Sequence, residues 1–183
     1  MDDFLRRIYL SELLGQAENA IASITQLNAY LAARHLTAVD RVNGVLRALD
    51  DFLGDAARMR LMLWPPRKAA EARGASLREV LQIDDGHPLQ NATLRHHLEH
   101  FDERLDAWAR ESPNRIYVDR NVGPRNMIGG VDPRDIIRQF VPEENVYIFR
   151  GEEFDIQALV TSVDELIPKI RTQLDELLRR RGG

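Results

Sequence analysis

Three of the five histidines of this chain lie close together, at His96, His97 and His100, and Arg95 directly precedes the first of them. An unperturbed histidine titrates near neutral pH, so its ring can accept and return a proton under physiological conditions. An arginine guanidinium is permanently charged and offers two parallel N–H donors to a phosphate. Arg95 and His100 therefore have the chemistry to hold a phosphate and to move a proton beside it.

The pattern Arg95-His96-x3-His100 resembles the Arg-x4-6-His signature of the HEPN superfamily, whose members are small helical domains. The resemblance covers the helical region to about Glu111. It implies a homodimer in which arginine and histidine from both subunits line a shared cleft. It also implies that Arg95 holds the phosphate and that His100 takes or gives the proton of the ribose 2′-OH. His96 stands where the family usually has a polar residue, commonly asparagine.

What this resemblance implies for function is a metal-independent endoribonuclease, in the role of a toxin or a defence component. RNA is then the substrate, and an antitoxin or another regulatory protein is an expected partner. We expect no cofactor. Many domains of the superfamily have no catalytic activity, so a non-catalytic helical interaction or scaffold protein is the alternative from another functional class.

A metal site is a third interpretation of the same segment. His96, His100 and Glu103 follow one another at i, i+4 and i+7, which places them on one face of a helix. Two histidines at this spacing suit zinc or another divalent ion, and Glu103 is a candidate third ligand. A metalloenzyme built on this site would need another histidine or carboxylate from a facing helix. The remaining neighbour, His97, falls nearer the apolar seam of the helix, and we expect it to be structural.

The composition limits the remaining classes of function. The chain has 183 residues, is 44% hydrophobic and carries a net charge of −4, which fits one domain with a sizeable core and argues against a purely electrostatic nucleic-acid binder. It has no cysteine, which excludes disulfides, thiol catalysis and cysteine-ligated zinc. With no signal-like segment and no apolar run of membrane-spanning length, we expect a cytoplasmic protein without a membrane partner.

Apolar residues at three- and four-residue steps predict three long helices in the first part of the chain. The first spans about residues 10–31. The second begins at the capping pair Thr37 and Asp40 and ends before Trp64-Pro65-Pro66. Ser76 and Glu79 predict the cap of a short helix that ends near Ile83. The third long helix carries the motif and runs from about Pro88 or Asn91 to Glu111.

The pattern changes after Pro113. Strands are predicted at residues 115–119 and 145–149, with a short third strand at 154–156. Asp132-Pro133 has the form of a helix start, and a last helix should be kinked, or truly begin, at Pro168. Five arginines in this part, at positions 115, 120, 125, 134 and 138, could contact RNA, although a solvated surface is the favoured interpretation. We therefore predict a mainly α fold, with an up-and-down bundle over residues 1–113. Residues 114–183 should form a small α+β extension, a β-hairpin and helix packed on the same domain.

Overall fold

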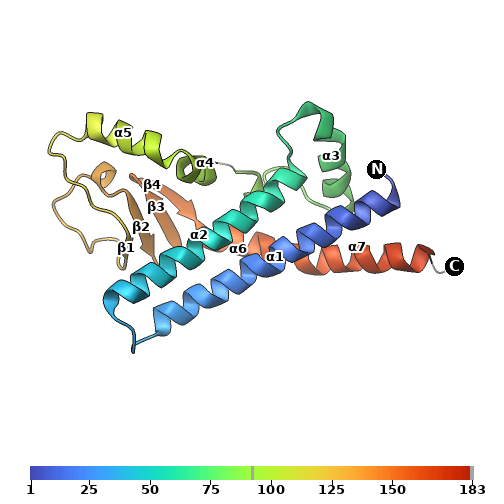
Figure 1. Ribbon diagram of the computed structural model, residues 1–183, viewed down its shortest axis with the longest axis horizontal. Coiled ribbons are helices and arrows are strands. Elements are labelled where there is room, and N and C mark those ends of the chain that lie inside the picture. The colour runs from blue at the N-terminus through green and yellow to red at the C-terminus, as the bar shows by residue number, and fades with distance from the viewer. Residues whose placement is uncertain (92, 182–183) are drawn as a thin grey trace. The chain divides into compact units, whose positions relative to one another are not determined.

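The computed structural model describes residues 1–91 and 93–181, without the side chains of Arg95 and Arg181 (Figure 1). The fold is mainly α with a small β region towards the C-terminus, as predicted. The helices are α1 (Asp3–Ala32), α2 (Ala38–Leu63), α3 (Glu71–Val80), α4 (Thr93–Glu99), α5 (Phe101–Glu111), α6 (Ile156–Asp164) and α7 (Leu166–Arg181). The strands are β1 (Asn121–Val122), β2 (Arg138–Val141), β3 (Val146–Phe149) and β4 (Glu152–Asp155).

The chain forms two compact units that are not contiguous in sequence. The first unit contains Met1–Ile24, Asp51–Asn91 and Leu159–Gly183, and the second contains Thr25–Asp50 and Ala92–Ala158. The helices α1 and α2 each contribute one part to each unit. The predicted boundary after Pro113 lies inside the second unit, and the division into a bundle and an extension stays a prediction. Within the described chain, no helix has the length and apolar character needed to cross a membrane.

In the first unit, α3 is attached to the C-terminal end of α2. The last carbonyls of a helix have no partner within that helix. Here Arg73 donates to the carbonyl of Met62 at 3.0 Å, and Arg78 donates to the carbonyl of Leu63. The predicted cap at Ser76 is wrong, because α3 already begins at Glu71 and Ser76 lies inside it. The preceding turn of 3-10 helix at Lys68–Ala70 runs directly into α3 and supplies its start.

In the second unit, the four strands form a sheet in the order β1-β2-β3-β4. β1 pairs with β2 in parallel, whereas β2, β3 and β4 are successive antiparallel strands. Arg150 and Gly151 join β3 to β4 with φ angles of 49° and 84°, which is the left-handed backbone that a tight two-residue hairpin turn requires. The predicted strand at 145–149 and the short strand after it are thus confirmed.

Two predictions in this region are wrong. The segment 115–119 makes only an isolated bridge, between Val118 and Ile136, and β1 instead lies at Asn121–Val122, where no strand was predicted. Asp132 does accept a hydrogen bond from the amide of Arg134, but it caps only a 3-10 turn at Pro133–Asp135. The chain then enters β2, because pairing with β1 and β3 takes up the backbone that a helix would have used. The expected break near Pro168 is confirmed, since α6 ends at Asp164 and α7 begins at Leu166.

A half-buried ion pair connects three segments of the second unit. The guanidinium of Arg138 on β2 binds both carboxylate oxygens of Asp119, at 2.8 and 2.6 Å. The same guanidinium lies 4.6 Å from the ring centroid of Phe101 on α5. Burial acts to raise the pKa of Asp119, but the hydrogen bonds and charge of Arg138 outweigh it and hold the pKa below its ordinary value. The pair therefore joins the loop before β1, the sheet and α5.

We predict that Asp119→Asn lowers the free energy of unfolding at pH 7 by about 2 kcal/mol, between the values typical of exposed and of fully buried pairs. An acid whose pKa is lowered by folding contributes stability above its ordinary pKa of 3.8, and this contribution is lost as the pH falls through the folded-state value. The difference between wild type and variant should thus shrink below about pH 4. Urea titrations at several pH values measure it, with the exposed Glu143→Gln as a control that should stay within about 0.5 kcal/mol of wild type. A difference that does not change with pH would contradict this account.

Candidate functional site

The motif residues lie on α4 and at a bend between α4 and α5. The prediction of one unbroken helix to Glu111 is wrong at His100, whose φ and ψ of −106° and 39° place it outside both helices. Figure 1 shows α4 nearly end-on and α5 lengthwise, so the chain changes direction there. The amide of His100 still donates to the carbonyl of His96 at 3.1 Å, so one helical turn is preserved up to the bend.

His97 attaches α4 to the sheet. Its Nε2 lies 2.8 Å from Oε2 of Glu152 on β4, and its ring is stacked on Phe149 of β3 with centroids 5.0 Å apart and planes at 10°. Phe154 of β4 presents its edge to the same ring at 6.1 Å. Only 17% of the His97 side chain is exposed. These contacts give His97 the structural position that the sequence predicted.

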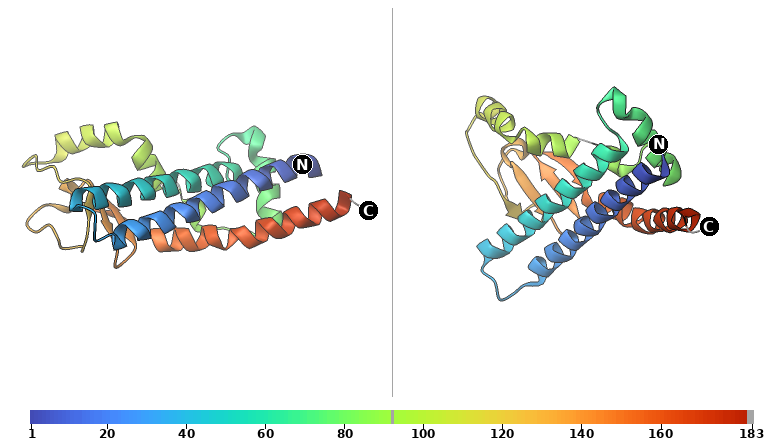
Figure 2. Two further views of the ribbon diagram at one scale, coloured as in Figure 1. Left: turned by 60° about the horizontal axis from the view of Figure 1, so that its bottom comes forward. Right: turned by 45° about the vertical axis from the view of Figure 1, so that its right-hand side comes forward.

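Contacts with the same sheet hold α5 on the other side of the bend. Phe101 packs edge-on against Phe149 with centroids 6.2 Å apart. Farther along α5, Nε1 of Trp108 donates to Oδ1 of the buried Asp135 at 2.9 Å. Both α4 and α5 lie beside the strands in every view (Figures 1 and 2). Phe149 thus contacts one residue before the bend and one after it, which explains why a helix without glycine or proline bends here.

Arg150 gives α5 a further attachment, near its C-terminal end. Its guanidinium lies 2.6 Å from the carboxylate of Glu111 and 3.4 Å from the carbonyl oxygen of Arg104. Arg150 is the first residue of the turn between β3 and β4, so this contact depends on that turn. Contacts with the β region therefore extend along most of α5.

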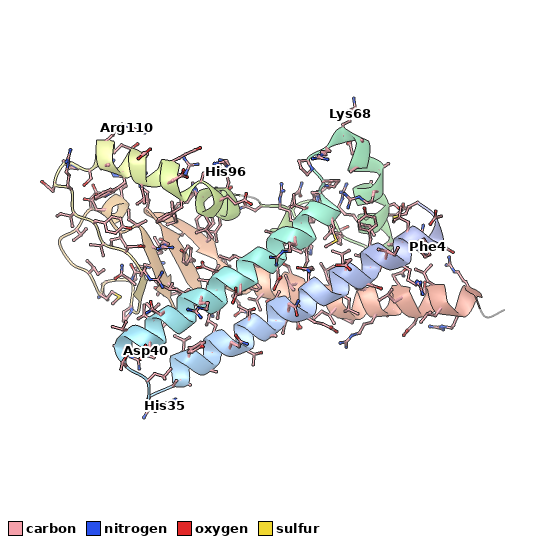
Figure 3. All side chains as sticks on the ribbon, viewed as in Figure 1. Phe4, His35, Asp40, Lys68, His96 and Arg110 are labelled. Atoms are coloured by element: carbon pink, nitrogen blue, oxygen red, sulfur yellow. The ribbon has the colours of Figure 1, made fainter. Side chains whose placement is uncertain are left out.

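The structure brings His96, His100 and Glu103 together at the surface. The rings of His96 and His100 have centroids 4.5 Å apart and planes inclined at 50°. His100 Nδ1 lies 3.3 Å from Oε1 of Glu103. His96 is exposed, on the outer side of α4 in Figure 3, and 42% of the His100 side chain is exposed. When Nδ1 of His100 carries the proton and donates to Glu103, Nε2 keeps its lone pair for a proton or a metal ion.

Arg95 lies in α4, directly before His96, but its side chain falls outside the described part of the structure. Its role as a phosphate clamp therefore stays a prediction. Glu152 and Phe149, which hold α4 in place, were not identified from the sequence. They lie more than fifty residues after His97, and no local pattern connects them to it.

Most arginines after Pro113 are bound to neighbouring polar groups. Arg120 donates to Asn43 at 2.9 Å, and Arg125 pairs with Glu144 at 2.6 Å and with Glu153. Arg134 and Arg138 pair with Asp132 and Asp119. Arg125, Arg134 and Arg138 are paired with carboxylates, and a guanidinium that is already neutralised has less to gain from a phosphate. The pairing thus favours a solvated surface here over an RNA-binding one.

Other candidate metal ligands do not gather around the histidines. Among residues 1–91 and 93–181, no three His, Asp or Glu side chains are placed to hold one ion. His87 belongs to the first unit, where its Nδ1 accepts a hydrogen bond from the amide of Leu89 at 3.3 Å. Burial, and then the charge of Lys169, lower the pKa of His87. This histidine therefore caps the turn that follows it.

No protein-family model, curated protein or solved structure matches this chain. The resemblance of Arg95-His96-x3-His100 to the HEPN signature thus rests on the motif residues alone and stays a prediction.

Proposed function

We propose that the protein is a metal-independent endoribonuclease of the HEPN type, with His100 as its acid/base and Arg95 as its phosphate clamp. The observation that carries the proposal is the surroundings of His100. This partly exposed histidine has Nδ1 beside the Glu103 carboxylate, and when that nitrogen carries the proton, Nε2 has the lone pair that a general base needs. His96 lies against the same ring and completes the site.

The reaction uses a nucleophile that RNA itself provides. His100 Nε2 removes the proton of the 2′-OH, and the 2′-oxygen forms a bond to the adjacent phosphorus. The bond from phosphorus to the 5′-oxygen breaks, and that oxygen takes up a proton from the second subunit's protonated histidine. The products are a 2′,3′-cyclic phosphate and a 5′-hydroxyl. Arg95 offsets the charge that grows on the phosphate oxygens. An antitoxin or a regulatory protein would control such an activity in the cytoplasm.

The second candidate is a non-catalytic interaction protein, and exposed apolar residues on the first turns of α1 favour it. Phe4 is 55% exposed, and Leu5 and Ile8 are each 41% exposed (Phe4 is labelled in Figure 3). Large apolar side chains grouped on a surface are typical of contact sites for other molecules. The absence of any RNA cleavage in the experiments below would favour this function.

The first prediction of the proposed function concerns assembly. One Arg95/His100 pair supplies either the base or the acid at a given moment, so two copies should share a cleft on a two-fold axis. Light scattering at tens of micromolar protein is expected to give twice the mass of the chain. A monomer at that concentration would count strongly against the nuclease.

The second prediction separates this nuclease from a metal-dependent one. Because the site contains a proton carrier and a phosphate clamp, RNA cleavage should survive EDTA and leave 2′,3′-cyclic phosphate ends. The measurement is the cleavage rate and the chemistry of the product ends, with and without chelator. Activity that is lost in EDTA and restored by a divalent ion would instead make His96, His100 and Glu103 metal ligands.

The third prediction is specific to single residues. His100→Ala should abolish cleavage and change the free energy of unfolding by no more than about 0.5 kcal/mol, because the side chain is partly exposed and lies off the apolar seam. Arg95→Ala should also abolish cleavage, and Arg95→Lys should not fully restore it, since lysine lacks the two-donor fork. Melting curves and cleavage rates are measured on the same preparations.

His97→Ala is the contrasting variant in this series. It removes the stacking on Phe149 and the bond to Glu152, so it should cost about 1–3 kcal/mol of stability and leave the chemistry intact below the melting transition. The exposed His35→Ala is the neutral control for both properties. If His100→Ala unfolds the protein, or His97→Ala alone removes activity, the site has been assigned to the wrong face.

A further inference from the structure

Two histidine rings lie side by side at the bend. The amide of His100 donates to the carbonyl of His96 at 3.1 Å, so the two backbones stay one helical turn apart. The ring centroids lie 4.5 Å apart, and the rings are inclined at 50° rather than stacked. Two inclined rings one turn apart can each direct a nitrogen to one point between them. Both side chains are open to solvent, so an ion can reach that point.

The donor atoms decide which class of ion suits this pair. Imidazole nitrogen is a good ligand for zinc, copper and nickel, with zinc–nitrogen bonds of about 2.0–2.1 Å. Magnesium and calcium prefer oxygen ligands and have little affinity for two imidazoles. The pair is therefore suited to a divalent transition ion, of which we take zinc as the probe.

Glu103 adds a second, independent feature of a zinc site. A histidine that binds zinc through one nitrogen commonly donates its other N–H to a carboxylate, which fixes the ring and makes the ligand nitrogen more basic. His100 and Glu103 are placed for this arrangement, with 3.3 Å between Nδ1 and Oε1. Since no third protein ligand is gathered in the described residues, water would fill the other coordination positions. Such a site would be reversible and regulatory rather than structural.

We propose that His96 and His100 together bind one zinc ion, with Glu103 as the hydrogen-bond partner of His100, and that the bound ion inhibits the ribonuclease. The inhibition rests on the proposed function. A lone pair of His100 that is bonded to zinc cannot accept the proton of a 2′-OH, so metal binding and catalysis exclude each other at this nitrogen. The same residues would thus catalyse cleavage without a metal ion and would be inhibited when zinc binds to them.

Calorimetric titration of zinc into the metal-free, full-length protein tests the site directly. One zinc ion per chain is expected, and magnesium should give no binding signal. His96→Ala and His100→Ala should each weaken zinc binding at least about tenfold, because one of two protein ligands is lost. Glu103→Gln should weaken it by about tenfold, as is usual when the hydrogen-bond partner of a ligand is removed. His35→Ala, the matched control, should bind zinc like wild type.

An equal zinc affinity in His96→Ala and wild type would overturn the site. The aromatic C–H signals of the histidines in NMR spectra provide a second measurement, and those of His96 and His100 should shift together on addition of zinc. Shifts confined to His35 or to His87 would also overturn the proposed zinc site.

The inhibition is tested with RNA cleavage. Zinc should lower the rate of wild type, and EDTA should restore it, with RNA and zinc alone as the blank. For His96→Ala, the zinc concentration that halves the variant's own rate should rise at least about tenfold, in parallel with its weaker binding. Zinc binding without cleavage under any condition would overturn the proposed function and the inhibition with it, and leave the site standing. Cleavage that is indifferent to zinc, with no binding, would overturn the site and leave the nuclease standing.

Discussion

The ring of Phe149 is the contact on which the geometry of the candidate site depends. It is almost fully buried, and it packs against His97 before the bend and against Phe101 after it. Two aromatic contacts on one buried ring fix where α4 ends and α5 begins, because moving either helix would separate a pair of rings that each contribute about 0.5–1.5 kcal/mol beyond their burial. The segment after Pro113 therefore has a structural role. Its strands hold α4, which carries His96, and α5, which begins directly after His100.

Local signals in the sequence were sufficient for much of the fold. The hydroxyl of Thr37 accepts from the amide of Asp40 at 3.1 Å, as the capping pattern predicted, and α2 ends before Trp64-Pro65-Pro66. The strand at 145–149 was equally clear, because its residues favour extended backbone. Where the prediction of a helix after Asp132 failed, a distant partner decided the outcome. Asp132 has every local mark of a helix start, but the residues after it pair with strands on both sides.

The same distinction applies to the site. Helical spacing alone placed His96, His100 and Glu103 side by side, and their contacts survive the bend because the hydrogen bond between the backbones of His96 and His100 is preserved. Spacing along the chain could not show that Glu152 and Phe149 would hold His97. Those contacts join residues far apart in sequence, and a pattern of local periodicity contains no information about them. The position of Arg95 relative to His100 depends on a side chain that lies outside the described part of the structure.

The acidic residues of β4 have a consequence for the behaviour of the protein at high concentration. β4 is an outer strand of the sheet, so one side of its backbone is not paired within the sheet. An unpaired strand edge can form hydrogen bonds with strands of other molecules, which leads to aggregation. Charged side chains along the edge oppose this pairing. Glu152, Glu153 and Asp155 supply three carboxylates in four residues. The glutamates that bind His97 and Arg125 thus also protect the open edge of the sheet.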